Sequence, residues 1–354
     1  MVSKDKVKNY LEITKPSRKV LFLNPDRGHT CSFYRSGGIA KNLRNQLGAD
    51  YSIDVVAWTD ISTDWQTISN YDIIMLQRPY HRSAVDFCIH VKQMRIPLWL
   101  DYDDNLFCVA PENRAWPIFD DPIIQSQIRK MLEIADIITV TTEDLRKSYL
   151  QFNKNIVVIP NAFNDTIFDV NRKLDKRDNI VLWRGSDTHI YDIMCYAPAI
   201  SKCTEEFPEY EFNYVGYNPW FLGNSDGKPA KNQCFIRAMD VVDYFDRCFS
   251  LKPAVVHTPL HDNLFNRCKS NIAFIEGTYW GAICIIPEFW GDIPGTLKYK
   301  DQASYYEALR SVLAGEVDIV ANNELAWQYV KQNLLLSNIN KLRVKVIKSL
   351  LKKK

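Results

Sequence analysis

The chain has 354 residues, of which 46% are hydrophobic and 12% aromatic, and this suffices for one large or two smaller packed domains. A formal net charge of +2 excludes the strong overall field of a basic nucleic-acid-binding protein. The nine cysteines include no C-x-x-C pair, so they lack zinc-site spacing and indicate a reducing compartment. The N-terminal stretch has no apolar signal region, and no apolar run reaches membrane-spanning length, so a cytoplasmic protein is expected.

Apolar runs alternate with helical patterns through the first half of the chain. Strands are predicted at residues 19–24, 51–58, 71–78, 97–100, 137–140 and 156–159. Helices are predicted from Ile39 onward, over 85–94, over 124–134 and over 143–152, the last capped by Thr142. Strands that alternate with helices predict a parallel, doubly wound α/β sheet.

Polar residues follow two of these strands. A loop with Arg27 and Gly28 comes after the first strand, and Tyr34 and Arg35 precede a Gly-Gly pair. Ligands bind at the carboxyl ends of strands in open α/β sheets, which makes the loop a candidate site. A simple turn explains its glycines about equally well, and there is no G-x-G-x-x-G fingerprint.

Three carboxylates follow the strand at 97–100, namely Asp101, Asp103 and Asp104. Such a cluster is costly unless its members are solvated or have partners. Its options are a metal, a general base, hydrogen bonds to sugar hydroxyls, or a solvated turn. The position at a strand end favours a role in a site.

The second half repeats the alternation after a polar, non-periodic stretch at 162–179. Strands are predicted at 180–183, 210–215, 254–257 and 282–286. Helices are predicted up to about Cys203, near 241–245, and over 305–313 with Ser304 as the cap. Two successive α/β domains with a cleft between them are therefore expected.

The stretch 264–286 carries the strongest signal of a binding site. Ser270 and Asn271 stand where a helix N-cap is expected, Lys269 precedes them, Glu276 lies about two turns further on, and Gly281 ends the helix. A helix N-terminus with a lysine beside it suits a phosphate or diphosphate. Glu276 would then lie near a ribose hydroxyl. An ordinary amphipathic helix with a solvated lysine is the alternative.

Four segments together resemble the GT-B glycosyltransferases, in particular the large retaining family whose second domain holds a nucleotide-sugar. They are residues 137–168, Trp183-Arg184-Gly185-Ser186, residues 269–281 and residues 324–335. The resemblance implies two Rossmann-like domains that face a central cleft. It places an acceptor-side domain at 1–170, a nucleotide-sugar-binding domain at 171–323, and a C-terminal crossing helix at about 324–354.

The family motif of the second domain is a Glu, seven residues and a second Glu. The resemblance assigns Glu276 to the ribose as the second Glu, whereas the first falls on Cys268. It also implies a diphosphate site in which Arg184 and His189 take part. The donor-binding residues expected from the resemblance and from the strand ends are Gly28, Arg184, Gly185, Ser186, His189, Lys269, Ser270 and Glu276.

A departing nucleoside diphosphate gains negative charge, which Arg184 and Lys269 could stabilise without a metal. Asp103 is expected to orient the acceptor hydroxyl. Arg27, Tyr34, Arg35, Asp101 and Asp104 are expected to line the acceptor side of the cleft.

The resemblance therefore implies a hexosyl- or related transferase that uses a nucleotide-sugar, with UDP as the expected nucleotide, with retention and with no cofactor. The acceptor stays open between a glycan, a protein, a lipid-linked sugar and a modified nucleic acid. A phosphorylase or epimerase on the same frame, or a binding protein that has lost catalysis, are the alternatives.

The C-terminal segment, residues 339–354, is basic and amphipathic if helical. It could lie on an anionic membrane or on nucleic acid. A solubilising helix end, with lysines that complement the helix dipole, is the favoured interpretation.

Overall fold

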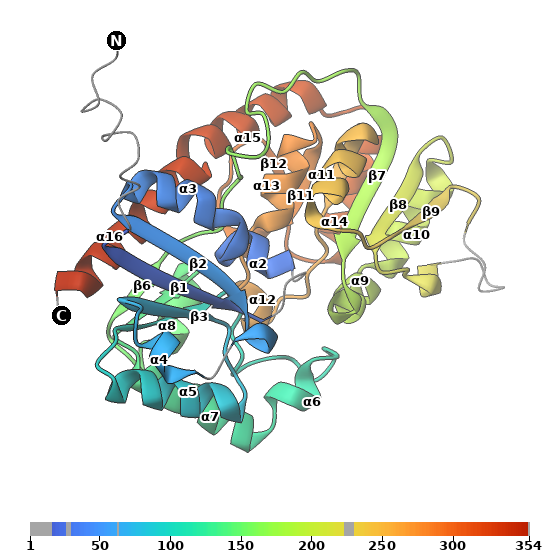
Figure 1. Cartoon of the computed structure of the whole chain (residues 1–354). Coiled ribbons are helices and arrows are strands. Elements are labelled where there is room, and N and C mark those ends of the chain that lie inside the picture. The colour runs from blue at the N-terminus through green and yellow to red at the C-terminus, as the bar shows by residue number, and fades with distance from the viewer. Residues whose placement is uncertain (1–15, 26–29, 62–63, 223–229, 353–354) are drawn as a thin grey trace, which may run out of the picture.

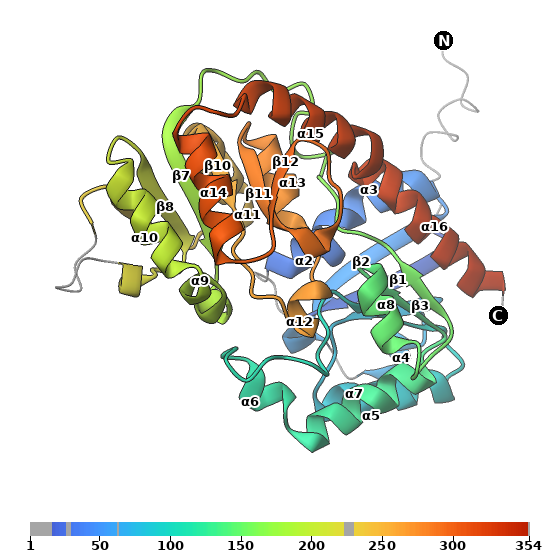
Figure 2. The ribbon, with the colours of Figure 1, turned by 180° about the vertical axis from the view of Figure 1, so that it is seen from behind.

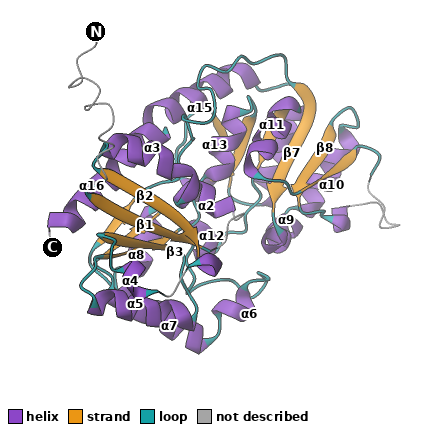
Figure 3. Cartoon of the chain, in the orientation of Figure 1, coloured by secondary structure: helices purple, strands orange, loops and turns teal. Residues whose placement is uncertain are grey.

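The structure is a computed structural model that describes residues 16–25, 30–61, 64–222 and 230–352 (Figure 1). The described chain forms two six-stranded sheets, and every strand pair within them is parallel. Helices flank both sheets (Figure 3). This arrangement confirms the predicted α/β architecture of two doubly wound sheets.

The first sheet has the strand order β2-β1-β3-β4-β5-β6. Its strands are β1 (Arg18–Asn24), β2 (Tyr51–Ala57), β3 (Ile73–Gln77), β4 (Leu98–Tyr102), β5 (Ile137–Val140) and β6 (Ile156–Val158). Every residue of β3 and β4 is buried. Because both faces of a parallel sheet are covered, its inner strands are continuous apolar runs, and for this reason the sequence revealed them.

The second sheet has the order β12-β11-β10-β7-β8-β9. Its strands are β7 (Asp178–Gly185), β8 (Glu211–Gly216), β9 (Gln233–Arg237), β10 (Pro253–His257), β11 (Ile283–Pro287) and β12 (Thr296–Tyr299). The sequence did not predict β9 and β12, which are the two edge strands. Both are largely half-exposed or exposed, so neither shows a continuous apolar run.

Helices connect most of the successive strands in both halves, and most of these helices begin at a polar N-cap residue. Those of the first half are α2 (Thr30–Arg35), α3 (Gly37–Leu47), α4 (Trp65–Ile68), α5 (Arg82–Gln93), α6 (Trp116–Phe119), α7 (Pro122–Ile134) and α8 (Glu143–Tyr149). Those of the second are α9 (Ile190–Cys195), α10 (Ala197–Glu206), α11 (Val241–Ser250), α12 (Leu264–Arg267), α13 (Ile272–Tyr279) and α14 (Gln302–Leu313). Short 3₁₀ turns are η1 (Trp58–Asp60), η2 (Asp187–His189), η3 (Trp220–Leu222) and η4 (Glu288–Trp290).

Two predicted caps have different outcomes. Thr142 caps α8 as expected, because its hydroxyl accepts from the Leu145 N–H at 3.2 Å. The prediction for α14 is wrong, since Asp301 is its N-cap. Ser304 is the third helical residue, and its hydroxyl completes a capping box with Asp301.

The C-terminal region, where one crossing helix was expected at about 324–354, consists of two helices. Helix α15 (Ile319–Asn333) packs on α13 and β11 of the second half, and α16 (Leu336–Lys352) packs on α3 of the first half (Figure 2). The chain passes back beside the first crossover, where Phe163 exchanges backbone hydrogen bonds of 2.8 Å with Leu334 and Leu336. The segment that leads from the first half to the second and the segment that leads back therefore lie side by side.

The amphipathic prediction for the C-terminal segment is correct in pattern, but its apolar face is occupied. Val346, Ile347 and Leu350 are buried on the first half of the chain. Lys341, Lys345 and their neighbours on the outer face remain exposed. Within the described residues, no helix has both the length and the hydropathy needed to cross a membrane.

Candidate functional site

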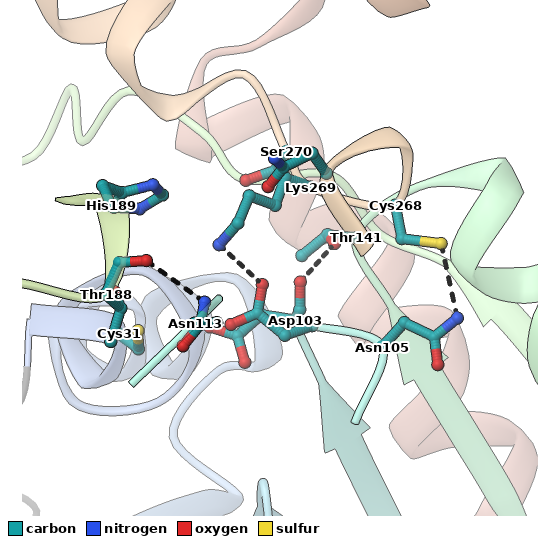
Figure 4. A network of polar contacts seen from close by, with 12 residues as sticks. Cys31, Asp103, Asn105, Asn113, Thr141, Thr188, His189, Cys268, Lys269 and Ser270 are labelled. Atoms are coloured by element: carbon teal, nitrogen blue, oxygen red, sulfur yellow. Dashed lines mark hydrogen bonds and ion pairs between the residues drawn. The ribbon is translucent and has the colours of Figure 1, made fainter. Parts of the chain in front are cut away.

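The carboxyl ends of the strands of both sheets come together at one place. The segment after β4 reaches the loop after β7, where the Asn113 side chain donates to the Thr188 carbonyl at 3.2 Å. Arg114 pairs with Asp187 at 3.2 Å in the same loop. Figure 4 shows this junction, to which both halves contribute polar side chains. Such strand-end edges are where ligands bind in open α/β sheets.

On the first-half side, Asp103 and Asp104 share the guanidinium of Arg78. Arg78 Nε donates to Asp103 Oδ1 at 2.7 Å, and its terminal nitrogen lies 3.0 Å from Asp104 Oδ2. Burial is the largest single effect and opposes ionisation of Asp103, but Arg78, with smaller effects of Arg35 and Cys31, lowers the pKa of Asp103 below its usual value. Arg78 itself has a positive φ of 48° at the end of β3, which is uncommon for a non-glycine residue.

Asp101 and Arg35 do not line a cleft, contrary to the expectation. The Arg35 guanidinium donates two hydrogen bonds, of 2.7 and 2.8 Å, to the Asp101 carboxylate, and each residue is only 1% exposed. The Thr139 hydroxyl also donates to Asp101, and Arg35 reaches the Ile159 carbonyl. Through these hydrogen bonds the Asp101 carboxylate links β4, β5 and α2 in the interior of the first half. The Asp101–Arg35 pair therefore has a structural role.

Glu276 is the centre of a second buried cluster. Tyr34 donates to one carboxylate oxygen, and Tyr244 donates to the other at 2.8 Å. Arg184 Nε lies 2.8 Å from Oε2 as an ion pair, although its N–H direction does not meet hydrogen-bond geometry. Glu276 is 2% exposed and Tyr34 is 3% exposed. Tyr34 is therefore an internal partner of Glu276 in this structure and not an open wall of a cleft.

Three basic side chains of the second half, those of Arg184, His189 and Lys269, lie near one another. His189 Nδ1 is 2.9 Å from Asp192 Oδ2. Burial and then the positive charge of Lys269, with a smaller effect of Arg184, hold the pKa of His189 below its usual value. Lys269 Nζ also reaches Asp104 Oδ1 across the junction, at 3.4 Å. Lys269, His189 and Arg184 thus form one basic cluster where the ends of the two sheets meet, and Lys269 and Arg184 carry its positive charge.

The helix start predicted beside Lys269 is present. Of the two residues expected at the cap, Asn271 is the N-cap of α13, and it makes no side-chain capping bond. The Ser270 hydroxyl instead accepts from Asn161 of the first half at 2.8 Å. The first backbone N–H groups of α13 therefore lack a side-chain cap, which leaves them able to receive an anion.

The remaining predicted donor residues lie at the end of β7. Gly185 is required there, because a Cβ atom would stand 2.6 Å from the Trp183 ring. Ser186 is exposed, and its hydroxyl lies 2.7 Å from that of Thr188. Arg27 and Gly28 lie outside the described residues.

Sequence reasoning missed several polar residues that hold this site. Asp192 orients His189, and a signal existed, since it follows His189 by three residues on one helix face. Arg78 was visible as a polar strand end but had no predicted role. Tyr244 and Asn161 had no signal, because their partners are more than thirty residues away.

A pocket of about 210 Å³ lies beyond α12, at the ends of β10, β11 and β12. It contains none of the predicted site residues. Among the residues that the structure describes, no group of three His, Cys, Asp or Glu side chains could hold a metal ion.

The fold has clear counterparts among solved structures, although no family model and no curated protein match the sequence. HepE of Anabaena, solved with UDP and glucose, matches with a TM-score of 0.63 at 14% identity, over 94% of this chain and all of that one. The UDP-forming trehalose-phosphate synthase of Burkholderia xenovorans matches with 0.62 at 12% identity, over 95% and 99%. The UDP-GlcNAc 2-epimerase of Neisseria meningitidis, bound to UDP-GlcNAc, matches with 0.58 at 11% identity, over 94% and 100%. At these identities the likeness shows the fold, and the chain accordingly has the GT-B fold, as predicted.

Proposed function

We propose that this chain is a glycosyltransferase that moves a sugar from a UDP-sugar to an acceptor hydroxyl, with retention and without a metal. The observation that carries the proposal is the basic cluster of Arg184, His189 and Lys269, in which Arg184 and Lys269 carry the positive charge and which lies where both sheets end. Two of the compared structures, HepE and the epimerase, were solved with UDP or a UDP-sugar bound. The uncapped start of α13 adds backbone donors for a diphosphate beside this group.

The charges suit a reaction in which a nucleoside diphosphate leaves. As the bond to the sugar breaks, negative charge grows on the diphosphate, and fixed cations beside it lower the barrier. Lys269 and Arg184 supply permanent charge, and His189 can take up a proton when the anion arrives. Asp103 is the first-half carboxylate proposed to orient the acceptor hydroxyl.

Glu276 is proposed to hold the ribose once the donor binds. In the present arrangement the Tyr34 hydroxyl occupies one carboxylate oxygen, so a ribose hydroxyl would have to replace it. Both groups donate one hydrogen bond to the same oxygen, and the exchange leaves the carboxylate satisfied. Arg184 and Tyr244 would keep their places on the other oxygen.

The proposal is tested first by binding. UDP should raise the melting temperature of the purified chain, because a ligand of the folded state stabilises it by mass action. GDP, ADP, TDP and CDP form the comparison panel. If none of the five nucleotides stabilises the protein at millimolar concentration, the proposed donor site is refuted. If UDP does, release of UDP from UDP-sugars with candidate glycans identifies the acceptor.

An epimerase is the second candidate, because the Neisseria epimerase matches this chain nearly as well as HepE does, with TM-scores of 0.58 and 0.63. The two functions separate in one experiment. A UDP-sugar that is incubated without an acceptor should stay unchanged with a transferase, whereas an epimerase converts it to its C2 epimer. The sugar ring protons in an NMR time course distinguish these results.

A further inference from the structure

One short helix of the first half contacts the second half. Helix α2 lies between the two sheets (Figure 1), and the ring centroid of its Phe33 is 6.2 Å from that of Phe245 on α11. The next residue, Tyr34, donates a hydrogen bond from its hydroxyl to the carboxylate of Glu276 on α13. The residue after that, Arg35, donates two hydrogen bonds to β4 of the first half. Consecutive side chains of one helical turn therefore bind opposite halves of the molecule.

Both oxygens of the Glu276 carboxylate have partners in this arrangement. Tyr34 binds Oε1, whereas Tyr244 donates to Oε2 at 2.8 Å and Arg184 lies 2.8 Å from Oε2 as an ion pair. Burial, and then the negative charge of Glu276, raises the pKa of Tyr34 well above its usual value, so its hydroxyl keeps its proton and remains a donor. A ribose hydroxyl that binds Oε1 must therefore displace the Tyr34 hydroxyl.

Of these three partners of Glu276, Tyr34 is the one that comes from the other half. Tyr244 lies on α11 and Arg184 on β7, in the same half as the carboxylate. Arg35 fixes α2 to the first half, because its guanidinium also donates to the Ile159 carbonyl at 2.7 Å. When the two halves move apart, Tyr34 therefore moves away with the first half, and the other two partners stay on Glu276.

We propose that Tyr34 is an autoinhibitory latch between the two halves. In the nucleotide-free chain its hydroxyl occupies the place of a ribose hydroxyl on Glu276, and a nucleoside diphosphate binds after the halves have separated at this contact. This inference rests on the proposed function, because it takes Glu276 as the ribose-binding residue. The apparent affinity of a ligand falls with the fraction of molecules that are competent to bind it, so the latch weakens nucleotide binding.

Removal of the Tyr34 hydroxyl should strengthen the binding of UDP. In Tyr34→Phe, the Oε1 atom of Glu276 loses its partner in the nucleotide-free protein, and a ribose hydroxyl supplies a new partner in the complex. From the usual strength of a hydrogen bond to a charged group, the Kd for UDP should fall by about 10- to 100-fold. The nucleotide-free variant should also melt at a lower temperature than the wild type, because a buried oxygen without a partner is unfavourable. A residue with a merely structural role would lose stability without any gain in affinity.

Tyr244→Phe is the matched control for isothermal titration calorimetry with UDP. It removes the other tyrosine hydroxyl from the same carboxylate, but within one half of the molecule, so its Kd should not fall below that of the wild type. An equal Kd for the wild type and Tyr34→Phe, or an equal gain in Tyr244→Phe, would overturn the latch and leave the donor site standing. If none of the three full-length proteins binds UDP, GDP, ADP, TDP or CDP, the proposed function fails and the latch fails with it.

A second measurement needs no nucleotide. Hydrogen exchange of the backbone amides of α2 reports how often this helix opens from its contacts. Exchange in α2 should be faster in Tyr34→Phe than in the wild type, whereas Tyr244→Phe should leave it unchanged. Unchanged exchange of α2 in Tyr34→Phe would show that the hydroxyl does not hold the halves together, and it would overturn the latch even where UDP binds.

Discussion

Replacing Glu276 with glutamine should destabilise the protein by about 2 to 3 kcal/mol. The glutamine is nearly the same size and can still bond to Tyr34 and Tyr244, so the main loss is the charge opposite Arg184. That ion pair spans 2.8 Å, with Glu276 2% and Arg184 25% exposed. Breaking a fully buried pair on one side costs about 3 to 5 kcal/mol, and the quarter of Arg184 that water can reach reduces that figure.

The size of the effect can be isolated in a double-mutant cycle measured by urea denaturation. Arg184→Gln alone leaves a buried carboxylate, and the double variant with Glu276→Gln leaves no charge. The double variant should therefore lose less stability than the two single variants together, by about 1 to 2 kcal/mol. Glu143→Gln, at an ion pair whose Glu side chain is 51% exposed, is the control and should leave stability almost unchanged, because water screens the pair. A Glu276→Gln protein as stable as the control would refute the view that this carboxylate depends on Arg184.

Three further predictions concern catalysis, acidity and metals. Lys269→Ala should lower turnover by about 10²- to 10³-fold at saturating donor, because a cation opposite the leaving diphosphate is lost. The control variant Arg267→Ala, at an exposed ion pair, should keep the wild-type rate. A Lys269→Ala protein that turns over as fast as this control would contradict the phosphate role of Lys269. Burial lowers the pKa of His257 to about 3, so below pH 6.5 the unfolded chain binds the proton that the folded one excludes. Stability should thus fall as the pH drops from 6.5 toward 3, by on the order of 4 kcal/mol for this residue, and His257→Gln should flatten the urea-denaturation profile over that range. EDTA should leave transfer activity intact, since Asp103 and Asp104 have Arg78 as their partner; a loss that added metal reverses would make the two carboxylates ligands instead.

The sequence allowed prediction of those parts of the fold whose burial requires a continuous run of apolar residues. Strands β3 and β4 are buried at every residue, and so their apolar runs stood out. The edge strands β9 and β12 are less buried and contain both polar and apolar residues. A search for continuous apolar runs therefore did not find them. The break between α15 and α16 also left no Gly or Pro signal, because the Leu334–Leu336 stretch turns by pairing with Phe163, far away in the sequence.

The candidate site could be predicted only in its local parts. Lys269 and the start of α13 follow from residues that are neighbours in the chain. The contact between Tyr34 and Glu276 spans 242 positions, and that between Asn105 and Cys268 spans 163. Such contacts depend on how the two sheets are set against each other, which no local pattern specifies. For the same reason, Asp101 was expected in a cleft although Arg35 holds it inside.

The position of α16 has a consequence for how the protein is made on the ribosome. The face of the first sheet that carries Val20 and Phe22 is covered by Ile347 and Leu350, from the last helix of the chain. The first sheet is complete in sequence by residue 158, yet α16 begins only at Leu336. At about 5 to 20 residues per second, roughly 10 to 40 s of synthesis separate these points. During that interval, the part of this apolar face that α16 covers in the finished protein has no covering helix, so this half reaches its final packing only after the last helix has been made.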